Sequence, residues 1–201
     1  MLINTIKGKG DFMTKHFKTD NVIVRKFNMR DVEQVYSNFS TTEDKSIEET
    51  KITVKSAINE YYTDEPIWAI EDKQKKNLVG VIRVTNYCPK NKTCNITWTM
   101  SYKYWDNRFM KDALEQILLF LFTKKDIDLI ECSYYEHNKN TSIILDEVGM
   151  TREATLRDRR INEQTNEKEN FVIYSINKQE FFSKKELLFN NRVYNCLKRK
   201  I

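Results

Sequence analysis

The sequence has little of what metal sites and covalent catalytic triads require. Its 201 residues include two histidines, His16 and His137, and four cysteines. Among the cysteines only Cys88 and Cys94 are near one another, and no histidine stands beside them. These shortages disfavour a histidine-rich metal site, and no metal-ligand cluster, Ser-His-Asp arrangement or P-loop is visible. We therefore expect reduced thiols and no bound metal.

Long apolar runs are also missing. No stretch resembles a transmembrane span or a secretory signal, and the N-terminal residues include the charged Lys7, Lys9 and Asp11. The length suits one domain of moderate size. These features predict a cytoplasmic protein with no membrane partner.

The positive charge is confined to one end of the chain. The 34 basic and 29 acidic residues give a net charge of +5. From Lys178 onward there are seven basic residues against two acidic ones, so the preceding part is balanced. Residues 183–201 are predicted to form a basic helix with a solvated face. Because a nucleic-acid site would depend on this tail alone, we do not expect nucleic-acid binding.

Two helices are predicted before the middle of the chain. Asn28 is placed to cap the first, with Asp31 three positions later as in a capping box. The second spans residues 48–62. The side chains expected to face inward are Val32, Val35 and Tyr36 in the first helix and Ile52, Val54, Ala57, Ile58 and Tyr61 in the second. Strands are expected at 22–26, 68–70 and 78–84, the last two forming an antiparallel hairpin, with a bulge near Gly80.

The strongest periodic pattern predicts a strand, a loop and a helix in succession. Residues 96–104 favour a strand. The helix that follows has apolar residues at three- and four-residue spacing: Met110, Ala113, Leu114, Ile117, Leu118 and Leu121. In such a unit the N–H groups of the first helical turn can bind a phosphate.

The loop at residues 104–114, YWDNRFMKDAL, resembles the acetyl-coenzyme A loop of the GNAT superfamily of N-acetyltransferases, in its RimJ/RimL-type branch. That branch commonly has Tyr-Trp-Asn/Gly-Lys-Gly-Tyr-Met/Ala-x-Glu-Ala-Leu. Arg108 replaces the loop glycine, and Met110 occupies the small position two residues on. If the backbone there must be left-handed, arginine costs roughly 1–3 kcal/mol. A guanidinium is also a good phosphate ligand.

A second segment, residues 138–150, matches another GNAT signature, Asn-x-x-Ser followed by a short helix ending in Gly-Phe. Local chemistry predicts Asn140 as the N-cap and Gly149 at the left-handed C-terminal position. The inward side chains are expected to be Ile144, Leu145 and Val148. The resemblance implies that Asn138 contacts the pantetheine arm and that Thr141 protonates the departing thiolate. Helix capping is the alternative role for both.

A third segment resembles the usual end of RimJ/RimL-type proteins. It has Leu156-Arg157-Asp158, a polar hairpin tip from Asn162 to Glu169, and the strand 171–176. Asn170 replaces the aspartate that usually precedes this strand. Tyr174 is expected to be a core residue.

The resemblance covers residues 21–182, between a flexible extension at 1–20 and the basic helix at 183–201. It implies an α/β (α+β) GNAT-like fold, in which helices flank a mixed, curved sheet with two splayed central strands, here 96–102 and 128–135. The residues implied to bind the cofactor are Trp98, Thr99, Met100, Asn107, Arg108, Phe109, Met110, Lys111, Asn138 and Thr141.

The implied reaction is acetyl transfer from acetyl-CoA, the cosubstrate, to a primary amine of a protein N-terminus or a small molecule. A protonated amine needs a base, and Glu136 and His137 are candidates because they border the thioester end. The alternative is a degenerate, non-catalytic GNAT domain that acts as a binding module, which the departures at Arg108, Met110 and Asn170 would favour. The oligomeric state stays open, a homodimer included.

Overall fold

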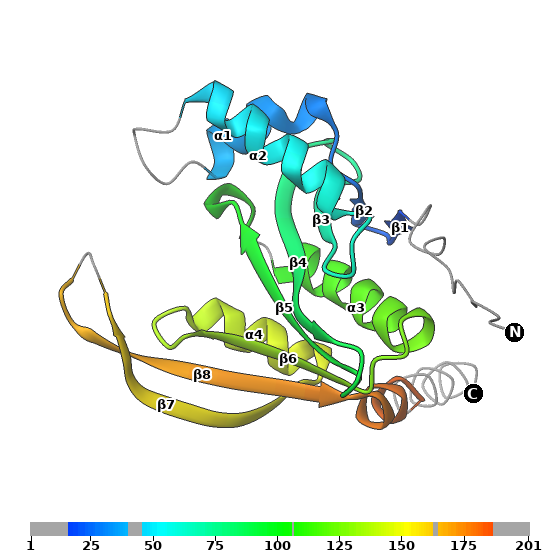
Figure 1. Ribbon diagram of the computed structural model, residues 1–201, viewed down its shortest axis with the longest axis vertical. Helices are drawn as coiled ribbons and strands as arrows, with labels where there is room; N and C mark the ends of the chain where they lie inside the picture. Colours follow the sequence, from blue (N-terminus) through cyan, green and yellow to red (C-terminus); the bar gives the residue numbers. More distant parts are fainter. Residues whose placement is uncertain (1–15, 40–45, 106, 163–164, 187–201) are drawn as a thin grey trace, which may run out of the picture. The chain divides into compact units, whose positions relative to one another are not determined.

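The computed structural model describes residues 16–39, 46–105, 107–162 and 165–186 (Figure 1). Its strands are β1 (Phe17–Lys18), β2 (Val22–Arg25), β3 (Ile67–Asp72), β4 (Leu78–Cys88), β5 (Thr93–Met100), β6 (Leu129–Tyr135), β7 (Thr151–Ile161) and β8 (Lys168–Asn177). Its helices are α1 (Val32–Phe39), α2 (Ile47–Glu60), α3 (Asn107–Lys124), α4 (Lys139–Val148), the short 3-10 helices η1 (Met29–Asp31) and η2 (Tyr102–Tyr104), and residues 178–186.

The strands form one mixed sheet in the order β1-β2-β3-β4-β5-β6-β8-β7. β5 and β6 run parallel, while β2–β3, β3–β4, β6–β8 and β7–β8 are antiparallel. This topology confirms the predicted mixed α/β fold. No helix among the described residues is long and apolar enough to cross a membrane.

The chain divides into two compact units. The first comprises residues 1–84 and 98–113, and the second comprises residues 85–97 and 114–201. β4, β5 and α3 each contribute residues to both units.

In the first unit, local polar contacts fix the start of η1, which leads directly into α1. The Asn28 side chain accepts a hydrogen bond from the Arg30 N–H at 2.9 Å, and Asp31 accepts one from the Asn28 N–H at 2.8 Å. This is the predicted capping box. Asp31 also pairs with Arg25 at 2.7 Å, and Arg25 pairs with Glu71 of β3 at 2.7 Å. The buried carboxylate of Asp31 is therefore neutralised, as burial requires.

Two side chains predicted to face inward are exposed instead. Ile52 is 68% exposed, because α2 turns Thr50, Val54 and Ala57 to the core and position 52 lies on the opposite side of the helix. Tyr36 of α1 is 41% exposed, which keeps its hydroxyl in water. These two predictions were wrong.

In the second unit, β6 and β8 contribute buried side chains to the core. Contacts between residues close in sequence define the helix ends. Gly149 follows α4 with φ +89°, the predicted left-handed position. The final described helix begins at residue 178, before the predicted start at 183, and its Phe181 ring packs 5.4 Å from Phe122 of α3. Residues 187–201, the rest of the predicted basic helix, lie outside the described residues, as do residues 1–15 of the predicted extension.

Candidate functional site

The ladder between β5 and β6 is short, although both strands continue. It consists of the pairs Thr93–Leu129, Cys94–Ile130 and Asn95–Glu131. Over the described residues β6 continues beyond this point, pairing with β8 as far as Tyr135. The two strands therefore part after Asn95 and Glu131, which is the splay predicted from the sequence.

The first unit contains the end of β5. Trp98 and Met100 are half-buried and Thr99 is exposed. The strand ends at Met100, whereas the sequence predicted a strand up to Tyr104. Residues 102–104 form a 3-10 turn instead, because the Tyr104 N–H donates to the Ser101 carbonyl at 2.9 Å.

The loop that follows η2 leads directly into α3, which begins at Asn107. Arg108 is therefore a helical residue, and it is not among the described residues with positive φ. The backbone strain considered for arginine at this position does not arise. Asp106 lies outside the described residues.

Met110, the other departure in the loop, belongs to the core. Its side chain is fully buried, and a methyl group placed on Gly80 of β4 would come within 3.2 Å of its Cε atom. The absent side chain at Gly80 provides the space that Met110 fills. Only the backbone of Met110 can therefore face a cofactor. All six apolar residues predicted for the inner face of α3 are buried.

A basic cavity lies at the N-terminus of α3, within the first unit. Its volume is about 380 Å³, and it is lined by Asn21, Asp72, Gln74, Lys75, Lys103, Tyr104, Arg108 and Phe109. Three of these residues are cationic and one is anionic. Because two of the lining residues belong to the first turn of α3, the positive end of the helix dipole adds to the field there. Such a cavity suits a phosphate group. Lys111, in the next turn, is half-buried.

In the second unit, Asn138 occupies the N-cap position of α4 without capping it. Its side chain makes no capping hydrogen bond, and the residue is exposed. The helix starts at Lys139, so the predicted N-cap at Asn140 was wrong. Thr141 is buried in the first turn, where its N–H donates to the Asn138 carbonyl at 3.1 Å. The Asn138 amide is thus available to a ligand.

Glu136 lies in a polar cluster with the β7–β8 hairpin. Asn170 donates to its carboxylate at 2.7 Å, and Arg152 does so at 3.4 Å. The Asn170 side chain also accepts a hydrogen bond from the N–H of Asp158, a residue with φ +55° at a bulge in β7. Asn170 therefore ties three segments together by donating and accepting, which an aspartate could not do.

His137 has a carboxylate partner that sequence reasoning missed. Its Nδ1 atom lies 2.6 Å from Oε1 of Glu169. Glu169 pairs with Arg160 across the hairpin register, and its carboxylate is also held by that arginine. The only sequence signal was the hairpin itself, and fixing its register required knowing the bulge at Asp158.

Tyr174 is a core residue, as expected. It is 4% exposed on β8, with its ring 6.0 Å from that of Tyr134. Burial, together with the charge of Asp146, raises the pKa of Tyr174 to about 12. Its hydroxyl is therefore protonated at neutral pH.

Comparison with known proteins connects these features to a family. The model of the acetyltransferase (GNAT) domain matches residues 19–151. The chain belongs to the GNAT acetyltransferase family. It is thus an acyltransferase by family, and acetyl-CoA is its cosubstrate.

Known GNAT proteins match over most of the chain. The uncharacterized N-acetyltransferase YoaA of Bacillus subtilis (strain 168) is 23% identical over 150 residues, covering 70% of this chain and 85% of that protein. The structure of ribosomal-protein-S5-alanine acetyltransferase from Vibrio fischeri has a TM-score of 0.70 at 13% identity, covering 84% and 99% of the two chains. The microcin C7 self-immunity acetyltransferase MccE, solved with acetyl-CoA and AMP, has a TM-score of 0.67 at 14% identity, covering 79% and 93%.

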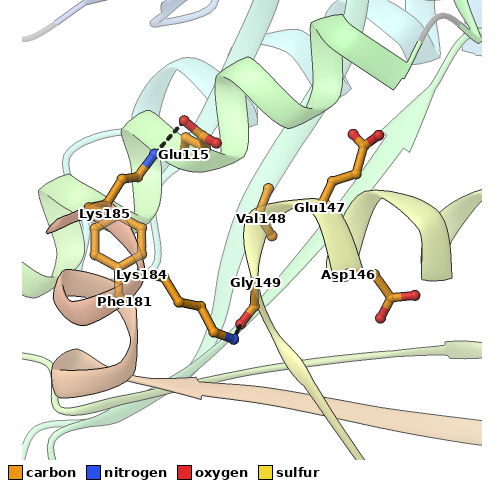
Figure 2. A pocket seen from close by; sticks show the side chains of 8 residues that line it. All are labelled: Glu115, Asp146, Glu147, Val148, Gly149, Phe181, Lys184 and Lys185. Atoms are coloured by element: carbon orange, nitrogen blue, oxygen red, sulfur yellow. Dashed lines mark hydrogen bonds and ion pairs between the residues drawn. The ribbon is translucent and has the colours of Figure 1, made fainter. Parts of the chain in front are cut away.

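A second cavity in the GNAT chain, of about 320 Å³, lies where residues 178–186 meet α3 and α4 (Figure 2). Lys185 pairs with Glu115 of α3 at 2.5 Å, and Lys184 donates to the Gly149 carbonyl at the end of α4. Both lysines hold the last described helix in place.

The predicted site residues form two groups, residues 98–111 in the first unit and residues 136–141 in the second.

Proposed function

We propose that this protein transfers the acetyl group of acetyl-CoA to a primary amine, with the α-amine of a peptide as the favoured acceptor. The observation that carries the proposal is the parting of β5 and β6 after Asn95 and Glu131, and it is supported by the exposed Asn138, whose side chain makes no capping hydrogen bond. A strand edge with free backbone groups can pair with the amides of the pantetheine arm. The match to the acetyltransferase (GNAT) domain supports acetyl transfer as the reaction at this opening.

The first unit would supply the phosphate contacts. Arg108, Lys75 and Lys103 line one cavity at the start of α3 and can neutralise a diphosphate. The departures at Arg108 and Met110 would favour a loop that no longer binds a cofactor. The helical backbone at Arg108 removes one reason for that view, and the fit of Met110 against Gly80 removes another. The pantetheine would pair with the backbone of Trp98, Thr99 and Met100. The phosphate would accept hydrogen bonds from the N–H groups of residues 107–111.

The second unit would supply the groups at the thioester end. Asn138 would hold the pantetheine arm by its side-chain amide, and the Thr141 hydroxyl would protonate the leaving thiolate. Glu136 and His137 precede Asn138 directly and are the candidates for removing a proton from the amine. Both are exposed, so an acceptor can reach them.

The choice of a peptide acceptor is supported by the RimJ/RimL-type motifs and by the fold shared with a ribosomal-protein acetyltransferase. We infer that the chain lies in this branch. The inference is by analogy of fold and motif.

The proposal is tested with two pentapeptides that differ only in a free or an acetylated N-terminal alanine, incubated with acetyl-CoA and followed by mass spectrometry. The free peptide should gain one acetyl group and the blocked peptide none. Acetyl-CoA at about a hundred times its dissociation constant should stabilise the fold by roughly 2.7 kcal/mol, visible as a raised Tm. Asn138→Ala should reduce that shift with the fold intact. Absence of both product and shift would refute the proposal.

A further inference from the structure

The β7–β8 hairpin fixes a carboxylate against the His137 ring. Glu169 is 11% exposed, and Oε1 lies 2.6 Å from His137 Nδ1. The same carboxylate accepts hydrogen bonds from Arg160 Nε and Asn162 Nδ2, each at 2.8 Å. These contacts lower the pKa of Glu169, the Asn162 amide most of all, so the group is charged at neutral pH.

This contact determines which nitrogen of His137 carries the proton. An ionised carboxylate only accepts hydrogen bonds, so Nδ1 must be the protonated nitrogen of the neutral ring. Nε2 then holds the free lone pair. More than half of the His137 side chain, 59%, is exposed, which leaves this nitrogen open to an incoming group.

Glu136, the other candidate base, is differently placed. One of its oxygens accepts a hydrogen bond from Asn170 at 2.7 Å, and the other accepts one from Arg152 at 3.4 Å. Both of its oxygens are therefore already engaged by donors of the hairpin. Glu169 is thus the carboxylate in contact with the His137 ring, while Arg160 pairs with Glu169 and Arg152 with Glu136. Lys139 follows two residues later, with its N–H on the His137 carbonyl.

We propose that Glu169 is a positioning residue, which holds His137 with Nε2 directed outward so that this nitrogen takes the proton of the acceptor amine. The inference rests on the proposed acetyl transfer and deepens it. His137 stands directly before Asn138, the residue that would hold the pantetheine arm, so the base and the thioester contact are adjacent in the chain.

The proton balance follows from ordinary acyl transfer. His137 Nε2 takes a proton from the ammonium form of the acceptor, and the Glu169 carboxylate stabilises the resulting imidazolium. The amine lone pair forms a C–N bond with the acetyl carbon as the C–S bond breaks. The thiolate leaves with the bonding electrons and takes the proton of the Thr141 hydroxyl, which regains one from the second proton lost by nitrogen. His137 releases its own proton to solvent.

The tautomer is measured directly by two-dimensional ¹H–¹⁵N NMR of the histidine side chains. The chain has two histidines, so the variant His16→Asn suffices for assignment. Wild-type His137 should show the Nδ1–H tautomer, and Glu169→Gln should lose it. An Nε2–H tautomer in the wild type would overturn the proposal, whatever the activity.

Kinetics with the free-alanine pentapeptide test whether the pair acts in transfer. His137→Ala should lower kcat by about 100-fold or more, as expected for a general base, with partial rescue by added imidazole. Glu169→Gln should lower kcat by about tenfold, because the imidazole can then take the wrong tautomer. The dissociation constant for acetyl-CoA should not change. The matched control Glu167→Gln, exposed in the same hairpin, should behave as wild type.

The outcomes separate this inference from the proposed function. If the wild type acetylates the peptide and Glu169→Gln matches its kcat, the positioning role is wrong while the function stands. If the wild type acetylates no peptide, the proposed function with this acceptor fails and the base role of His137 fails with it, even where the tautomer is as expected.

Discussion

Single residues decide whether the loop before α3 can serve a cofactor. Arg108 replaces a family glycine, yet it lies in the first turn of a helix, where arginine is more favourable than glycine. Its side chain lines the basic cavity at the start of α3. We therefore expect the guanidinium to contact a phosphate where the glycine would allow close backbone approach.

This exchange predicts the effect of Arg108→Ala. Removing one charge-assisted phosphate contact should weaken acetyl-CoA binding by about 1.5–3 kcal/mol. Isothermal titration calorimetry measures the change, and the exposed Lys90→Ala serves as a control for net charge. Equal affinities for Arg108→Ala and wild type would mean that the arginine does not reach the phosphates.

The Gly80–Met110 contact predicts a negative coupling between two substitutions. In Gly80→Ala the new methyl group would lie 3.0 Å from the Thr99 carbonyl oxygen and 3.2 Å from Met110 Cε. Overpacking of this kind costs about 1–3 kcal/mol. In urea unfolding, the double variant with Met110→Ala should be more stable than the sum of the single effects predicts. Strict additivity would show that the two positions are independent.

Secondary structure elements were predictable where local chemistry sets them. The capping box of Asn28 and Asp31 and the left-handed Gly149 rest on contacts within a few residues, and the inner face of α3 has a single apolar stripe; all were predicted. Asn140 was mistaken for the N-cap of α4 because the pattern marks a polar residue near a helix start without fixing which one. The prediction that Ile52 faces inward was wrong because the second helix had two plausible apolar faces. Tertiary packing selected the face with Val54 and Ala57.

The hairpin of β7 and β8 should have a measurable acid dependence. The folded-state pKa of Glu169 lies below the ordinary 4.5, first because of the Asn162 amide. Its stabilisation is therefore complete above that ordinary value and is lost as the pH falls through the lowered folded value. The difference in unfolding free energy between wild type and Glu169→Gln should therefore shrink as the pH falls below about 5. Glu167→Gln should show no such trend.

The whole molecule has two compact units, and each is built from two segments that are separate in the sequence. β4, β5 and α3 each pass from one unit to the other, so neither unit is a continuous segment. Part of the candidate site also depends on contacts between residues that are far apart in the sequence. The partner of His137 comes from residue 169, and no local pattern could have joined them before the register of the hairpin was known.

Shared elements predict cooperative unfolding of the whole chain. All three tryptophans, Trp68, Trp98 and Trp105, lie in the first unit, so their fluorescence reports on that unit alone. Far-UV circular dichroism reports on the entire chain. The two urea transitions should coincide, because α3 cannot lose one half without weakening the other. Two separate midpoints would show that the units unfold independently.

The parting of β5 and β6 also has a consequence for amide hydrogen exchange. Beyond Glu131, β6 is paired on its β8 side, while the other side has lost the β5 ladder. Within the described ranges, backbone amides directed to that side have no strand partner to slow their exchange with deuterated water. We therefore expect fast-exchanging positions in the middle of the sheet, where slow exchange is the rule. If acetyl-CoA lies there, it acts as the missing strand, and adding it should convert these positions to slow exchange.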